Sequence, residues 1–122
     1  MIWGKDGMGT NYYAVRNRPT VDRPIHIGKS SAGWMFNFQT QNDPYNDPPV
    51  VWNTFNQVKL WLRTHTGPDK EYVIMDEYDR IVNLDDFLDL VESKQKEDAD
   101  NPRNFKYSRN VDGYRFKDED FC

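Results

Sequence analysis

The chain has 122 residues, of which 37% are hydrophobic and 15% aromatic, and its formal net charge at pH 7 is -4. This length suits one domain with one core, and the aromatic content separates the chain from disordered sequences. No run of about 20 apolar residues indicates a membrane helix, and a single cysteine, Cys122, excludes an intrachain disulfide. The acidic balance disfavours nucleic-acid binding, because phosphate contacts need clustered cations. The sequence therefore predicts a soluble, intracellular, folded protein.

The beginning of the chain divides into a short leader and the start of a domain. Residues 1–7 contain two glycines, and Met8 offers a second candidate start. We expect this leader to be disordered, because nothing in it would tie it to a core. We expect residues 8–122 to form a single domain, with a first strand at residues 10–16, where tyrosine and valine are frequent.

A β-hairpin is predicted for residues 25–38. Isoleucines flank His26, and aromatic side chains occupy every second position from Trp34 to Phe38. This period of two is typical of half-buried strands. Residues 28–33, with a glycine at each end, would form the connecting loop.

The later elements follow from helical stripes and turn residues. Residues 42–49 hold three prolines and should be irregular. Asn53 or Thr54 can cap a helix that ends before residue 66, and Asn83 can cap a second helix. Residues 72–82 predict a short hairpin, and the Asp-Gly pair at 112–113 predicts a turn between two final strands. The whole pattern predicts an α+β fold, an antiparallel sheet of about five to six short strands with two amphipathic helices packed on one face.

Gly28-Lys29-Ser30 resembles the end of a phosphate-binding loop. That motif needs a glycine five positions before the second glycine, where Arg23 stands, and it needs a helix afterwards, whereas a strand pattern follows. A nucleotide triphosphatase is therefore disfavoured. A smaller anion-binding nest for a phosphate-bearing ligand stays open, and its candidate ligand-binding residues are His26, Gly28, Lys29, Ser30 and Ser31.

We find no catalytic set elsewhere. Neither His26 nor His65 has a second histidine, a cysteine or a carboxylate at metal-ligand spacing. The sequence thus predicts no catalytic residues, no metal and no cofactor. The aromatic stripe from Trp34 to Phe38 is expected to pack under the helices rather than stack on bases. The candidate partner-contact residues are Tyr45, which lies within the proline-rich segment, and Trp52, which follows it.

Three blocks carry a resemblance to a known family: Met-Gly-Thr-Asn-Tyr-Tyr at 8–13, His-Ile-Gly-Lys-Ser-Ser-Ala-Gly-Trp at 26–34, and Asp-Glu-Tyr at 76–78. The chain resembles a family of small uncharacterised proteins of bacteriophages and prophages. The resemblance covers nearly the whole chain from Met8. It implies a phage origin and a location in the cytoplasm of an infected bacterium, and it implies little about mechanism. Many members carry paired cysteines that suggest a small metal knuckle. Residues 16–23 contain none here, which argues against a metal-dependent role.

Three functional hypotheses follow. The first is a phage accessory protein that binds a host or phage macromolecule, with a protein as the expected partner and modulation of host enzymes or defence as the expected effect. The second is a protein, or a weak enzyme, that binds a phosphate-bearing small ligand at Lys29 to Ser31. The third is a minor component of the virion.

Overall fold

The computed structural model describes residues 9–31, 33–95 and 108–118. The predicted leader at residues 1–7 lies outside these ranges. Within them the elements are β1 (Thr10–Arg16), β2 (Ile25–Ser30), β3 (Asn37–Gln39), β4 (Gln41–Asp43), β5 (Val50–Trp52), α1 (Phe55–His65), β6 (Tyr72–Asp76), β7 (Ile81–Val82), α2 (Leu84–Gln95), β8 (Arg109–Val111) and β9 (Tyr114–Lys117).

The strands form one large sheet and one small sheet. The seven-stranded sheet has the order β7-β6-β1-β2-β3-β9-β8, and β4 pairs with β5 in a sheet of two strands. The predicted α+β class is confirmed, but the strand number and the purely antiparallel arrangement are wrong. The sheet is mixed, because β9 pairs in parallel with β3 while every other pairing in it is antiparallel. The extra small sheet arises because the chain on both sides of the proline-rich segment is extended and paired.

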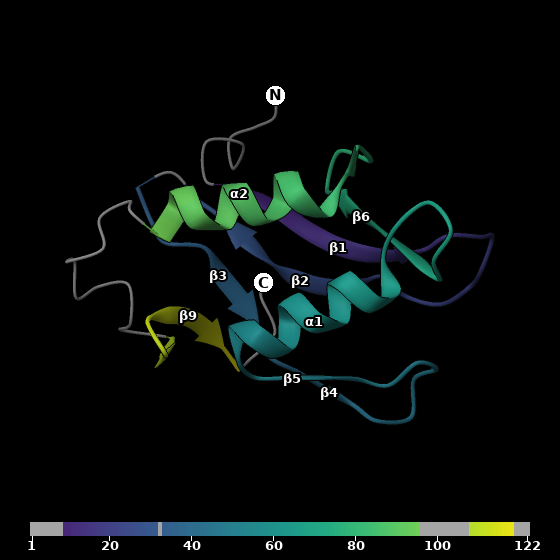
Figure 1. Cartoon of the computed structure of the whole chain (residues 1–122), viewed down its shortest axis with the longest axis horizontal. Coiled ribbons are helices and arrows are strands. Elements are labelled where there is room, and N and C mark those ends of the chain that lie inside the picture. The colour runs from purple at the N-terminus through teal and green to yellow at the C-terminus, as the bar shows by residue number, and fades with distance from the viewer. Residues whose placement is uncertain (1–8, 32, 96–107, 119–122) are drawn as a thin grey trace.

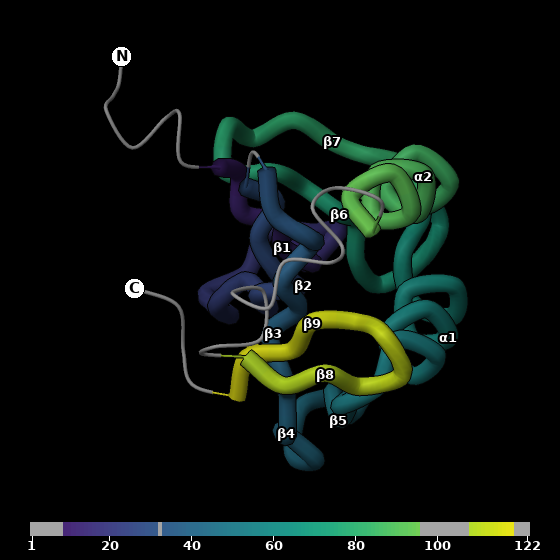
Figure 2. Tube along the Cα trace, turned by 90° about the vertical axis from the view of Figure 1, so that its left-hand side faces the viewer, coloured from purple at the N-terminus to yellow at the C-terminus, as the bar shows by residue number. Residues whose placement is uncertain are grey.

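Both helices lie on the same face of the large sheet (Figure 1), and the view from the side shows them as one layer against it (Figure 2). We call the other face, which is turned away from α1 and α2, the distal face. In α1 the stripe predicted from the sequence is buried at Val58, Trp61 and Leu62, and the Thr54 hydroxyl accepts a hydrogen bond from the backbone N–H of Gln57 at 3.2 Å. No helix within the described ranges is long and apolar enough to cross a membrane.

Aromatic side chains make up much of the core between the two layers. Phe36, Phe38, Phe87 and Phe116 are fully buried. The ring of Phe36 meets that of Phe87 on α2 edge to face, with centroids 5.4 Å apart. Such pairs add to the stability that burial already provides. The expectation that this aromatic stripe packs under the helices is therefore confirmed for Phe36 and Phe38.

The turns predicted from sequence are present at two hairpins. Asp112 and Gly113 join β8 to β9 with φ angles of 55° and 85°, the left-handed conformations that such a two-residue turn requires. Asp76 closes the turn between β6 and β7, and its carboxylate accepts hydrogen bonds from the backbone N–H groups of Tyr78 and Arg80 and from the Arg80 guanidinium. Burial opposes ionisation of Asp76, but these hydrogen bonds outweigh it and lower the pKa of Asp76 below its ordinary value.

Candidate functional site

A β-bulge decides which side chains of β2 reach the distal face. Tyr12 pairs with Gly28, but the next residue, Tyr13, pairs with His26, so Ile27 is an extra residue in β2. Ile27 is fully buried in the core. Because an inserted residue reverses the alternation of side chains beyond it, His26 and Lys29 lie on the same face of the sheet although they are three positions apart.

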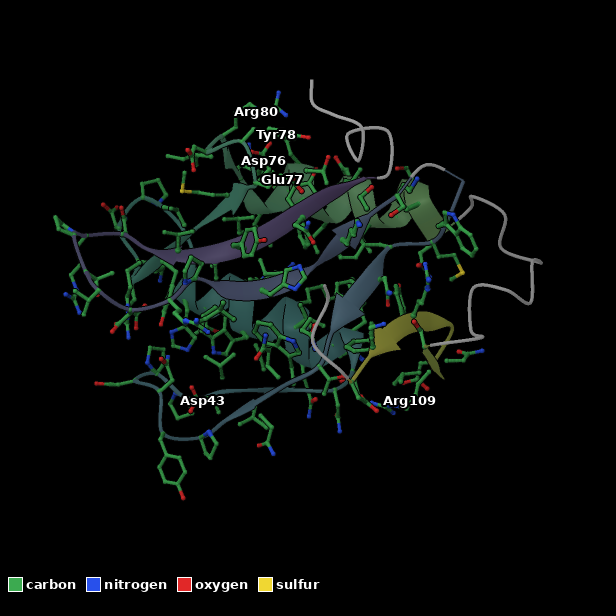
Figure 3. The ribbon with its side chains drawn as sticks, turned by 180° about the vertical axis from the view of Figure 1, so that it is seen from behind. Asp43, Asp76, Glu77, Tyr78, Arg80 and Arg109 are labelled. Atoms are coloured by element: carbon green, nitrogen blue, oxygen red, sulfur yellow. The ribbon has the colours of Figure 1, made fainter. Side chains whose placement is uncertain are left out.

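A large depression of the described surface lies over the distal face, which Figure 3 views directly. Its volume is about 660 Å³. It lies between the central strands β1 and β2 and the small β4–β5 sheet, where Asp43 is labelled in Figure 3. Polar side chains predominate in its lining, which consists of Asn11, Tyr13, Asp22, Arg23, Pro24, Ile25, His26, Gln39, Gln41, Asp43 and Asn46.

Hydrogen bonds fix the side chains at the centre of this depression. Asn11 donates from its backbone N–H and its side-chain NH₂ to the same carboxylate oxygen of Glu77, at 2.7 and 3.0 Å. The Asn11 side-chain oxygen is 2.9 Å from Nε2 of His26. Since this oxygen can only accept, Nε2 carries the hydrogen. The hydrogen bond to Asn11 thus sets the orientation of His26, and it shows that the side chains of Asn11 and His26 lie on one face of the sheet.

Tyr13 lies beside His26, with ring centroids 5.1 Å apart. Burial, and then the negative charge of Glu77, raise the pKa of Tyr13. Tyr13 therefore remains a neutral phenol at physiological pH and can donate a hydrogen bond to a bound group. This part of the depression is thus an ordered polar and aromatic surface.

The structure divides the five candidate ligand-binding residues. His26 lines the large depression, whereas Lys29 and Ser31 line a second, smaller pocket. Gly28 and Ser30 line neither pocket. The predicted loop at residues 28–33 is wrong in its first half, because β2 continues to Ser30. An extended strand points its successive N–H groups to opposite sides, so the backbone N–H groups of Gly28, Lys29 and Ser30 do not converge as a nest requires.

The two candidate partner-contact residues have opposite environments. The prediction that Trp52 is exposed is wrong: its indole is fully buried and donates a hydrogen bond from Nε1 to the backbone oxygen of Gln39 at 2.7 Å. Trp52 belongs to β5 and packs edge to face on Trp61 of α1. Tyr45 is 95% exposed, between two residues that line the large depression, Asp43 and Asn46.

The smaller pocket, of about 190 Å³, also contains residues that sequence reasoning did not single out. Asn37 of β3 and Arg115 of β9 line it together with Lys29, Ser31 and Trp34. No local pattern joins Lys29 to Arg115, because only the pairing of distant strands brings them together. The signal for Arg115 in the sequence is a positively charged residue between two aromatic residues, Tyr114 and Phe116, of a predicted strand.

Comparison with protein-family models, with curated proteins and with solved structures gives no match. Within residues 9–31, 33–95 and 108–118, no three side chains of histidine, cysteine, aspartate or glutamate are grouped so that they could hold a metal ion. The geometry of the distal face is therefore the main evidence for function.

Proposed function

We propose that this chain is a phage accessory protein that acts by binding a macromolecule of the phage or its host, and that a protein partner docks at the large depression of the distal face. The observation that carries the proposal is the preorganised row of Asn11, His26 and Tyr13 in its lining, where Glu77 accepts two hydrogen bonds from Asn11. A surface whose side chains are already ordered loses less conformational entropy on binding.

The composition of this surface favours a protein as the partner. Aromatic rings near the centre of a contact, with charged residues around them, are typical of protein–protein interfaces. Tyr13 and His26 supply adjacent aromatic rings to this surface, and Asp22 and Arg23 supply charged side chains. Tyr45 adds an exposed aromatic ring at the edge, which suits insertion into a pocket of the partner.

The resemblance to phage and prophage proteins supports the expected setting. Binding would take place in the cytoplasm of an infected bacterium, and modulation of a host enzyme or defence system would be its effect.

The test begins with capture of the partner by the full-length, tagged protein from lysate of the bacterial host, followed by reconstitution with the purified partner. We expect His26→Ala and Tyr45→Ala each to weaken the reconstituted complex by about tenfold or more, the usual effect at an interface hot spot. Tyr78→Ala is the matched control, because it removes a half-exposed tyrosine from the turn between β6 and β7. Its affinity should change less than about twofold.

Two outcomes would overturn the proposal. One is the absence of any stoichiometric partner from host and phage lysates. The other is a purified complex whose affinity is the same for the wild type, His26→Ala and Tyr45→Ala.

A further inference from the structure

The strand pairing places two cations and an amide in one row across the distal face. Lys29 of β2 is the partner of Asn37 of β3, and Asn37 is in turn the partner of Arg115 of β9. Neighbouring strands are about 4.8 Å apart, so the backbones of Lys29 and Arg115 are roughly 10 Å apart. Two long side chains at that separation can meet on a small group bound between them. The pocket of about 190 Å³ is at this position.

Every polar side chain that lines the pocket can donate a hydrogen bond, and none is a carboxylate. The lining consists of Lys29, Ser31, Trp34, Asn37 and Arg115. Asn37 uses its side-chain oxygen to accept a hydrogen bond from the Ser108 hydroxyl at 3.3 Å, which leaves its NH₂ group as a donor.

The charge of Arg115 is not compensated within the described part of the chain. The salt bridges there involve Arg16, His65, Arg80 and Arg109, but neither Lys29 nor Arg115. Nε of Arg115 is buried without a hydrogen-bond partner, and Nη1 reaches the backbone oxygen of Met35 only at 3.4 Å. Burial also lowers the pKa of this guanidinium, because the charged form has lost water. A buried donor without a partner is costly, and an anion would satisfy it.

The ring of Trp34 holds this guanidinium in place. The central carbon of the Arg115 guanidinium lies 5.2 Å from the ring centroid, within the range of a cation–π contact. The planar group is thus kept at the pocket, where it can form paired hydrogen bonds to the oxygens of an anion.

We propose that this pocket binds the phosphate group of a small phosphate monoester. A single carboxylate would leave one of the two positive charges uncompensated, whereas a phosphate monoester carries nearly two negative charges and three acceptor oxygens. The sequence pointed to a phosphate at Lys29 to Ser31, but the structure replaces the loop nest by a site shared among three strands. The proposal is independent of the protein partner, because this pocket and the large depression have no lining residue in common.

The test is calorimetry on the full chain with adenosine monophosphate, inorganic phosphate and adenosine as separate probes. We expect adenosine monophosphate to bind and adenosine not to bind. If inorganic phosphate binds as tightly as the nucleotide, the site recognises free phosphate, and if it binds more weakly, the ester is preferred. Lys29→Gln should weaken binding by about tenfold or more, the effect of losing one charge-assisted hydrogen bond.

Arg63→Gln is the matched control, since it removes one exposed positive charge from α1 on the opposite side of the sheet and should change the affinity less than about twofold. Arg115→Lys retains the positive charge but loses the planar pair of N–H donors, so it should weaken phosphate binding. Circular dichroism should show that this variant remains folded. The proposal is overturned if neither phosphate probe binds at about 10 mM, well above a millimolar Kd. Equal affinities of the wild type and Lys29→Gln, or binding of adenosine alone, would also overturn it.

Discussion

Replacing Gly28 by alanine should weaken the fold more than the same change at Gly33, the glycine in the β2–β3 connection. A Cβ atom at Gly28 would lie 2.5 Å from the backbone oxygen of Asn37 and 2.5 Å from Cε1 of Phe36, and 3.0 Å from the Cα of Phe38. Two of these three atoms belong to the backbone of the β3 segment, and the third belongs to a fully buried ring. None can swing aside, so β2 and β3 would have to separate.

The expected loss follows from the cost of overpacking. Inserting a methyl group into a well-packed interior costs about 1–3 kcal/mol, and the rigid neighbours place Gly28→Ala near 3 kcal/mol. For a chain of this size, about 3 kcal/mol corresponds to a decrease in Tm of about 12 °C. Gly33→Ala is the matched control, because no atom lies within 4 Å of its Cβ position and only its φ of +79° opposes the change. That strain costs about 1 kcal/mol, or about 4 °C.

Thermal unfolding followed by circular dichroism measures both variants, and urea unfolding provides the free energies independently. The slope of the urea transition should be unchanged, since the same surface is exposed on unfolding. Equal decreases in Tm and in the free energy of unfolding for Gly28→Ala and Gly33→Ala would refute the steric argument, because the close contacts at Gly28 would then have no effect on stability.

Three further predictions concern stability and can be measured by the same methods. Trp52→Ala should lower the free energy of unfolding by about 3–5 kcal/mol because the indole is fully buried. Tyr45→Ala should change it by no more than about 0.5 kcal/mol. Similar losses for the two variants would contradict the burial of Trp52. Thr54→Ala should cost about 1 kcal/mol by removing the cap of α1, and an unchanged Tm would contradict the role of that cap. The pKa of Asp76 is lower in the folded than in the unfolded chain, so the unfolded chain binds more protons. The stability that ionised Asp76 contributes is therefore fully present above its unfolded pKa. It is lost as the pH falls through its folded pKa. Asp76→Asn should therefore be less stable than wild type at pH 7, by about 2 kcal/mol, and the difference should narrow on acidification; a difference independent of pH would contradict this.

Sequence reasoning succeeded where structure depends on neighbours in the chain. The stripe of Val58 and Leu62 defines a buried helix face because residues three and four apart lie on one side of a helix. The turn at Asp112 and Gly113 follows from backbone conformations that these residue types favour. Both kinds of signal are contained in a few consecutive residues.

Sequence reasoning failed where structure depends on pairing between distant segments. The bulge at Ile27 cannot be recognised in β2 alone, because an extra residue exists only relative to β1. The parallel pairing of β3 with β9 has no local signal either. Because this pairing brings Arg115 close to Lys29, the pocket that the two residues line could not be predicted. Trp52 was misplaced because the proline-rich segment beside it suggested exposure, while its own strand packs against α1.

The parallel pairing of β3 with β9 also bears on the order in which the protein can assemble during synthesis. The strand order places β3 between β2 and β9, and the pairs Asn37–Arg115 and Gln39–Lys117 each join residues 78 positions apart in the sequence. Until β9 has left the ribosome, β3 can pair only with β2, and its other edge stays without hydrogen-bond partners. Contacts between such distant residues also form slowly, because a long loop must close first. The nascent chain would therefore expose an unpaired, aggregation-prone strand edge from the time β3 emerges until β9 emerges and pairs with it.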